Sequence, residues 1–169
     1  MIRQTIDYGI DLGTTNSEIA YIDPGMPPIV AENNYNEKIT PSAVACSNKG
    51  QLLIGKAAYA QYASHRWEDE DNVHTQFKRR MGTDDSFLFP YNGRRFFAHE
   101  LSAEVLKELR LSVERRSGEK IDAAIVTIPA AFEQPQIAAT RKAAELAGFQ
   151  ICELLQEPVA ASLAYGIRD

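Results

Sequence analysis

An acidic residue stands at the end of an apolar strand and directly before a glycine-rich turn near the start of the chain. Asp11 is followed by Leu-Gly-Thr-Thr-Asn-Ser, in which Gly13 lets the backbone approach a ligand closely. Successive amides in such a turn form a concave nest that suits phosphate oxygens, and Thr14, Thr15 and Asn16 add side-chain donors. A carboxylate beside a phosphate needs a cation between the two, so Asp11 implies Mg²⁺ held through its water molecules.

The same residues also fit an ordinary two-strand hairpin with glycine and threonine at its bend. The turn contains neither of the two common phosphate loops, G-x-x-x-x-G-K-[ST] and G-x-G-x-x-G. Because it joins a strand to a strand, a helix dipole is not the obvious source of attraction for a phosphate. The turn alone leaves phosphate binding and a plain hairpin open.

Two further segments carry charge where a ligand could use it. Lys78 lies in the run Phe-Lys-Arg-Arg-Met-Gly, and a lysine can meet a phosphate as a mobile point charge, although a solvated basic face is the alternative. Glu157 lies where the apolar segment 151–155 ends and a helix opens at Pro158, so it could also cap that helix. Ligands of open α/β sheets sit at the carboxyl ends of strands, which places Asp11 and Glu157 to meet one hydrated Mg²⁺.

The order of apolar runs and turn signals predicts a layered α/β domain with helices over a mostly buried sheet. Strands are expected over residues 4–12, 15–23, 29–32, 43–46, 52–54, 94–97, 123–128 and 151–155. Helices are expected over residues 56–63, from His99 to the stop signal Gly118, over residues 135–147, and from Glu157 onward. Residues 83–92 and the acidic run 68–71 are expected to be loops.

The composition is that of a soluble globular protein, with 44% hydrophobic and 24% charged residues in 169. The net charge of −5 argues against a nucleic-acid surface. No segment approaches the ~18 apolar residues that span a bilayer, and no secretion signal is present, so cytoplasm is the expected location. Cys46 and Cys152 match no metal spacing and are expected to be reduced, buried thiols. Surface positions are expected for His65, His74 and His99.

Four motifs occur in order along the chain. They are Asp11-Leu12-Gly13-Thr14-Thr15-Asn16-Ser17, Phe77-Lys78-Arg79-x-x-Gly82, Val126-Thr127-Ile128-Pro129-Ala130-x-Phe132 and Glu157-Pro158-x-Ala160-Ala161-x-x-Ala164-Tyr165-Gly166. Together they resemble the DnaK-type heat-shock chaperones over nearly the whole chain. The resemblance implies an actin-like ATPase domain of which the chain is the first lobe only. A mixed sheet flanked by helices would form an RNase-H-like base over residues 1–36 and 99–169, and residues 37–98 would form a small inserted α/β subdomain.

The resemblance also implies roles for single residues. Residues 13–16 would wrap the β- and γ-phosphates of ATP, and Asp11 and Glu157 would touch the water shell of the Mg²⁺. Lys78 matches the family's catalytic lysine, which positions the attacking water and completes a catalytic set with Asp11 and Glu157. Pro129 matches a proline proposed as a switch that reports the nucleotide state.

For the intact protein, the resemblance implies ATP hydrolysis that drives cycles of unfolded-peptide binding and release. ATP or ADP and Mg²⁺ would be the cofactors. A J-domain co-chaperone and a nucleotide exchange factor would bind through regions mostly absent here, and no nucleic acid or membrane partner is implied. The second phosphate loop and the adenosine pocket belong to the other lobe of the family's domain, so this chain alone is expected not to turn over ATP.

The sequence departs from the family pattern at two positions. Ile137 stands where an arginine usually helps to relay the nucleotide signal, and Ala131 replaces an aromatic residue. Both changes bear on the relay to a peptide-binding domain rather than on the ATP chemistry. Two other readings within the superfamily stay open at this point: a sugar or acetate kinase, which ATPase activity without added sugar would exclude, and an actin-type filament protein, which light scattering would reveal.

Overall fold

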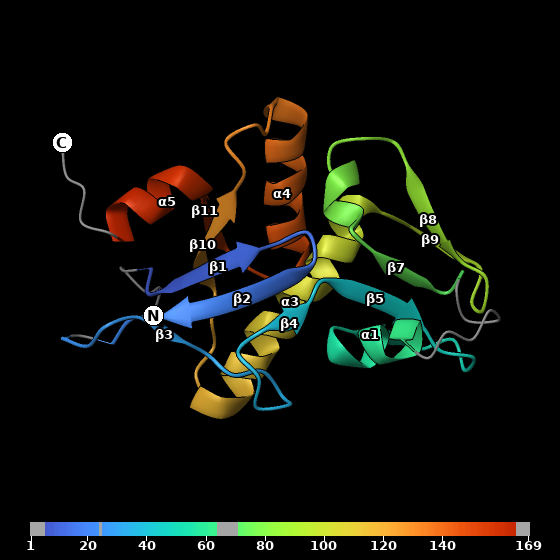
Figure 1. Ribbon diagram of the computed structural model, residues 1–169, viewed down its shortest axis with the longest axis horizontal. Helices are drawn as coiled ribbons and strands as arrows, with labels where there is room; N and C mark the ends of the chain where they lie inside the picture. The colour runs from blue at the N-terminus through green and yellow to red at the C-terminus, as the bar shows by residue number, and fades with distance from the viewer. Residues whose placement is uncertain (1–5, 24, 64–70, 165–169) are drawn as a thin grey trace.

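The computed structural model describes residues 6–23, 25–63 and 71–164 (Figure 1), and the side chains as far as Ala161. The sheet of the larger part lies at the left of Figure 1, and the smaller inserted part lies at the right. The expectations for His65, for residues 68–70 and for Tyr165-Gly166 fall outside the described residues.

The larger sheet is mixed and has the strand order β11-β10-β1-β2-β3, with β4 also paired to β2. Its strands are β1 (Tyr8–Leu12), β2 (Asn16–Tyr21), β3 (Ile29–Val30), β4 (Thr40–Pro41), β10 (Ala123–Ile128) and β11 (Ile151–Gln156). β1 runs antiparallel to β2 but parallel to β10, which is in turn parallel to β11. The carboxyl ends of β1, β10 and β11 therefore meet at one edge of the sheet, as the sequence predicts for the segments that carry Asp11 and Glu157.

Three helices cover this sheet: α3 (Ala98–Ser117), α4 (Gln134–Leu146) and α5 (Glu157–Ala164). The long helix α3 forms because an apolar stripe recurs every three or four residues and is buried, with Leu101, Val105 and Leu109 at most 2% exposed. The Glu100 carboxylate accepts the Phe97 amide at its start. Gly118 ends it in the left-handed conformation (φ 72°), as predicted from the sequence.

The inserted part contains β5 (Ala43–Cys46), β6 (Leu52–Ile54), α1 (Lys56–Ala63) and β7 (Val73–Thr75), followed by the 3-10 helix η1 (Phe77–Arg80) and the hairpin β8 (Ser86–Phe89) and β9 (Arg94–Phe97). The bounds predicted for β5, β6, α1 and β9 are confirmed. The loop expected over residues 83–92 is wrong, since β8 lies within it. The hairpin forms because Phe89 and Phe96 are buried with their ring centroids 5.4 Å apart.

The two parts share one hydrophobic core. It joins Ile10 and Leu12 of the larger sheet to Val44, Phe77 and Phe89 of the inserted part. α3 connects the two parts, because this helix packs against α4 and β2 of the larger part and against η1, β5, β6 and β9 of the inserted part. The position of η1, which carries Lys78, is therefore fixed by the helix that also supports the sheet. Among the described helices, none is long and apolar enough to cross a membrane.

Both cysteines are free, as predicted, but only one of them is buried. Cys46 is buried in β5, whereas Cys152 lies partly exposed on β11 at the end of the sheet order, so the expectation of two buried thiols is wrong for Cys152. Desolvation raises the pKa of both thiols, against the opposing charges of Arg94 and Arg141 respectively, and brings the pKa of Cys152 to about 11.

His74 and His99 are both partly exposed, so the expectation of a surface position holds only in part, and His74 also makes packing contacts. Its ring packs against Phe87 and Phe89, with centroids 5.1 and 4.6 Å away, and its Nε2 lies 2.8 Å from the Leu88 carbonyl oxygen. Since a carbonyl only accepts, the proton of the neutral ring is on Nε2. Desolvation lowers the pKa of His74, opposed by the Leu88 carbonyl and the charge of Asp71.

Candidate functional site

The carboxylate of Asp11 lies at the sheet edge where β1, β10 and β11 end. In register with it on β10 is Thr127, whose hydroxyl donates to Asp11 Oδ1 over 3.1 Å and holds the carboxylate in place. Thr127 pairs in turn with Leu155 on β11, two residues before Glu157. With neighbouring strands about 4.8 Å apart, the ends of β1 and β11 lie on the order of 10 Å from each other.

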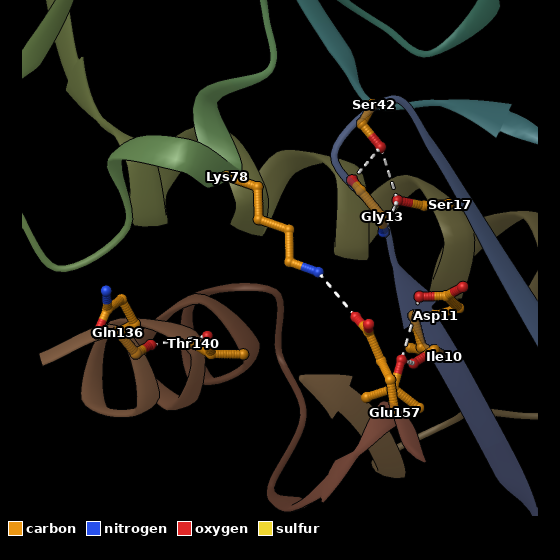
Figure 2. Close-up of polar contacts among 10 residues, drawn as sticks. Ile10, Asp11, Gly13, Ser17, Ser42, Lys78, Gln136, Thr140 and Glu157 are labelled. Atoms are coloured by element: carbon orange, nitrogen blue, oxygen red, sulfur yellow. Dashed lines mark hydrogen bonds and ion pairs between the residues drawn. The ribbon is translucent and has the colours of Figure 1, made fainter. Parts of the chain in front are cut away.

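The turn of residues 13–16, called here the phosphate turn, joins β1 to β2 as predicted. Gly13 is needed for space rather than for an unusual φ, because a Cβ there would lie 2.0 Å from the Asn16 carbonyl oxygen. Thr15 and Asn16 are exposed, and Thr14 is partly exposed. Two buried serines hold the turn from behind: the Gly13 amide donates to Ser17 Oγ (3.2 Å), and Ser42 Oγ donates to the Gly13 carbonyl (2.8 Å) (Figure 2).

Lys78 is buried, whereas its neighbours Arg79 and Arg80 are exposed. The difference arises from the short 3-10 helix η1, which docks the Phe77 side of the segment against α3. Gln76, just before the helix, adopts a left-handed conformation (φ 55°) that is uncommon outside glycine. The solvated basic face that the run Lys-Arg-Arg could have formed is thus limited to the two arginines.

The Lys78 ammonium group reaches across to the residues at the edge of the larger sheet. Its Nζ lies 3.3 Å from Glu157 Oε1 and 5.6 Å from the centre of the Phe132 ring (Figure 2 draws the ion pair). The Lys78 side chain is 8% exposed, whereas that of Glu157 is 45% exposed. An ammonium group paired with a carboxylate and facing an aromatic ring has its charge offset on two sides. Glu157 keeps oxygen atoms open to solvent.

The turn after β10 connects Pro129 to Lys78 through Phe132. The Phe132 amide donates to the Pro129 carbonyl over 3.1 Å, and this turn places the Phe132 ring beside the ammonium group. The two residues that depart from the family pattern lie close by: Ala131 is exposed in the same turn, and Ile137 is partly exposed in the first turn of α4.

The acidic residues at this edge fit a hydrated magnesium ion better than a directly bound one. In the part of the chain that the structure describes, no three His, Cys, Asp or Glu side chains converge closely enough to hold a metal ion. Asp11 and Glu157 each offer carboxylate oxygens, the ligands that Mg²⁺ prefers, and Mg²⁺ usually keeps several of its water molecules. Two carboxylates beside a phosphate turn therefore fit a magnesium ion that is bound mainly by phosphate oxygens and water.

The structure brings Asp11, the phosphate turn, Lys78 and Glu157 to one sheet edge, with Pro129 next to them. Four residues that contribute to the site had no predicted role, although the motifs include all of them except Ser42; they are Ser17, Ser42, Thr127 and Phe132. A polar residue inside the apolar run 123–128 was the available signal for Thr127. The roles of Ser42 and Phe132 depend on tertiary contacts that residue spacing does not reveal.

Comparison with known families agrees with this arrangement. A model of the Hsp70 protein family matches residues 7–89 and 84–169, which include every residue of the predicted site. Members of this family share an actin-like ATPase fold, bind nucleotide with Mg²⁺ and interact with client peptides. The fold class and the family expected from the four motifs are confirmed, and the chain belongs to the Hsp70 family of chaperone ATPases.

Proposed function

We propose that this chain forms one wall of the MgATP site of a DnaK-type chaperone. The observation that carries the proposal is the ion pair between Lys78 and Glu157, which joins the inserted part to the sheet edge that also holds Asp11 and the phosphate turn. A salt bridge that only stabilised the fold would not need Asp11 and the phosphate turn at the same sheet edge. A phosphate site needs donors, a cation and metal-binding carboxylates on one surface, and all three are present here.

The chemistry assigned to the site is phosphoryl transfer from ATP to water, which depends on charge neutralisation and placement more than on covalent help. Donors of the phosphate turn bind the β- and γ-phosphates, and Asp11 and Glu157 bind the water shell of Mg²⁺. Bound Mg²⁺ supplies further neutralisation of the phosphate charge. Lys78 stabilises developing negative charge and orients the attacking water, with its ammonium group held by Glu157 and Phe132.

In the intact protein, this hydrolysis would drive cycles of unfolded-peptide binding and release, assisted by a J-domain co-chaperone and a nucleotide exchange factor. Pro129 is the proposed switch, because its turn places the Phe132 ring against Lys78 and so links the lysine to the end of β10. The chain alone would not turn over ATP: its candidate ligands Asp11, Thr15, Asn16 and Glu157 are all exposed to solvent, so the γ-phosphate would not be enclosed.

Titration of the isotope-labelled chain with ATP, followed by the NMR shifts of its backbone amides, tests the proposal. We expect shifts at Thr14, Thr15 and Asn16 that require Mg²⁺ and disappear with EDTA. Lys78→Ala and Asp11→Asn should each weaken the binding about tenfold, because each removes a charge-assisted contact. Lys142→Ala is the matched control, since Lys142 is an exposed lysine of α4 that pairs with Glu145.

Three results would count against this assignment. Absence of shifts in the phosphate turn at millimolar MgATP would exclude the phosphate site. Equal weakening by Lys142→Ala would show that only net charge matters. Submicromolar affinity would show that one wall suffices for binding, and release of inorganic phosphate by the chain alone would show that the expectation of an inactive chain is wrong.

A further inference from the structure

Ser17 and Ser42 form a buried pair directly behind the phosphate turn. Ser17 is 0% exposed and Ser42 is 2% exposed, although serine is mostly found on protein surfaces. Their hydroxyl oxygens lie 2.8 Å apart, and each also contacts a backbone group of Gly13 (Figure 2). Because both hydroxyls are buried and contact the same glycine, the positions of their two protons determine how this cluster is hydrogen-bonded.

The donors and acceptors of this cluster can be assigned without ambiguity. The Gly13 carbonyl can only accept, so the proton of Ser42 lies on the 2.8 Å contact to that oxygen. The contact between the serines must then use the proton of Ser17, and Ser17 Oγ is left to accept the Gly13 amide at 3.2 Å. The three hydrogen bonds run in one direction from the Gly13 amide through Ser17 and Ser42 to the Gly13 carbonyl, and they form a closed ring.

The ring determines which way the neighbouring amides point. In a trans peptide the N–H group points opposite to the C=O group of the same plane, and the described residues contain no cis peptide. Because Ser42 holds the Gly13 carbonyl, the amide of Thr14 points away from Ser42. The backbone amide of Ser42 also donates to the Thr15 carbonyl over 2.8 Å, which turns the amide of Asn16 away in the same manner.

We propose that Ser17 and Ser42 are positioning residues that fix the phosphate turn in its binding conformation before nucleotide arrives. The inference rests on the proposed function and adds to it that the residues of the phosphate turn have different roles. Both backbone groups of Gly13 are hydrogen-bonded within the ring, so its amide is not free to bind the phosphates. Contacts to the phosphates come from Thr14, Thr15 and Asn16, whose amides the ring helps to orient.

The ring also links the phosphate turn to the inserted part. Ser42 stands between β4, which pairs with β2 in the larger sheet, and β5, the central strand of the smaller sheet. A movement of the inserted part that displaces Ser42 breaks the ring at two of its three bonds. The conformation of the phosphate turn therefore depends on where the inserted part sits, through a contact separate from the one between Lys78 and Glu157.

Hydrogen exchange at the Gly13 amide tests the ring without any nucleotide. Ser42 does not contact this amide, yet Ser42→Ala removes the acceptor that orients the Ser17 hydroxyl, so exchange at Gly13 should accelerate about tenfold. Ser42→Cys keeps the shape with a weaker donor and should give an intermediate rate. The double variant Ser17→Ala/Ser42→Ala should exchange no faster than Ser17→Ala alone, since either change opens the same ring. The amide of Val126 in β10 is the internal reference for global stability.

The matched control is Ser112→Ala. Ser112 is 1% exposed, and its hydroxyl donates to the Glu108 carbonyl within α3. Its replacement therefore removes one hydrogen bond of a buried serine at a place that does not contact the phosphate turn. It should leave Gly13 exchange unchanged relative to Val126. If Ser42→Ala leaves the Gly13 rate unchanged, or if the rate changes only in step with Val126, the ring does not act as a unit and the proposal is wrong.

MgATP titration of the same variants separates this inference from the proposed function. We expect Ser17→Ala, Ser42→Ala and the double variant to lose a similar five- to tenfold in affinity, and Ser112→Ala to lose none. Unchanged affinity in all ring variants, with normal binding by the unaltered chain, would overturn the positioning role alone. Failure of the unaltered chain to bind would overturn the proposed function, and the exchange experiment would still decide whether the ring exists.

Discussion

Lys78 is a buried lysine, and burial disfavours the charged form of its ammonium group. Its ammonium group is almost enclosed, and its compensation comes from one carboxylate that is nearly half exposed and from one aromatic ring. Taking a lysine out of water costs free energy that a partly solvated partner repays only in part. A buried lysine whose ammonium group pairs with Glu157 at the sheet edge that also carries Asp11 is therefore better explained by chemistry than by a contribution to stability.

Replacing this lysine with an apolar side chain of similar length should therefore not harm the fold. We expect Lys78→Met to leave the free energy of unfolding unchanged or to raise it by about 1 kcal/mol, while MgATP binding weakens. Urea denaturation measures the stability. Lys142→Met, at an exposed position in α4, is the control and should change neither quantity. A loss of more than about 1 kcal/mol in Lys78→Met would show that the ion pair is mainly structural.

His74 gives the fold a pH dependence with a definite sign. Desolvation lowers its pKa in the folded state, so the folded protein favours the neutral ring. Its contribution is fully present above the unfolded pKa of about 6.5 and is lost as the pH falls from there through the folded pKa. Denaturation between pH 7.5 and pH 5 should show a loss of stability that His74→Phe reduces. An equal loss in both proteins would assign it to other groups.

At the scale of secondary-structure elements, the site depends on the close approach of η1 to α4. Gly82, just after η1, has φ +75°, and a Cβ there would lie 2.7 Å from the Pro135 carbonyl carbon and 2.8 Å from the Gln136 amide nitrogen. Both neighbours are backbone atoms, which cannot rotate out of the way. The glycine thus allows the segment that carries Lys78 to pack directly on the start of α4.

Alanine at this position should separate η1 from α4. Gly93 is the matched control, because it has φ +68° but no atom within 4 Å of an added Cβ. Gly93→Ala should cost about 1 kcal/mol for the left-handed conformation, and Gly82→Ala about 1–3 kcal/mol more for the clash. Gly82→Ala should also shift the NMR signals of the Lys78 side chain. An equal loss of free energy of unfolding in the two variants would mean that the clash at position 82 is relieved without moving η1 away from α4.

The sequence predicts some elements better than others for identifiable reasons. β5, β6 and α1 have the predicted bounds because turn signals such as the segment 48–50 separate them. β8 was missed because it is short and flanked by Asp85 and Pro90, both typical of loops, and it is stabilised by Phe89 and Phe96 meeting in the core. η1 was missed because its four residues make a 3-10 turn whose burial depends on α3.

The predicted site residues follow the same pattern. Asp11 and Glu157 were placed correctly at one edge because strand direction follows from the alternation of strands and helices. The contact of Lys78 with Glu157 spans 79 positions and became predictable only through the family resemblance. The ring of Ser17 and Ser42 remained hidden, since serines flanking a turn are common and only their shared burial behind Gly13 distinguishes them.

At the scale of the whole molecule, the two parts are joined through one main hydrophobic core. α3 contacts both sheets, and the main hydrophobic cluster includes residues of both. A second cluster, made of Ala43, Ala45, Ala58 and Val73, is confined to the inserted part and too small to support it alone.

The shared core predicts a single unfolding transition. Leu106 of α3 is 0% exposed, and Leu106→Ala should cost about 2–5 kcal/mol. Amide signals of Val44 in the inserted sheet and of Val126 in the larger sheet should lose intensity at the same urea concentration in the original and in the variant. Separate midpoints for the two sheets would show that the inserted part folds on its own.

The most direct test of the account is the location of the metal ion that accompanies the nucleotide. Mn²⁺ takes the same oxygen ligands as Mg²⁺ and broadens the NMR signals of nearby nuclei. With MnATP, the signals of Asp11, Thr14, Thr15 and Glu157 should broaden first, and Mn²⁺ without ATP should have a much weaker effect there. A pocket lies at the other end of β1, and its lining includes Asp7, Asp23 and Lys38. Broadening centred on Asp7 and Asp23 of that pocket, with the phosphate turn unaffected, would contradict the account.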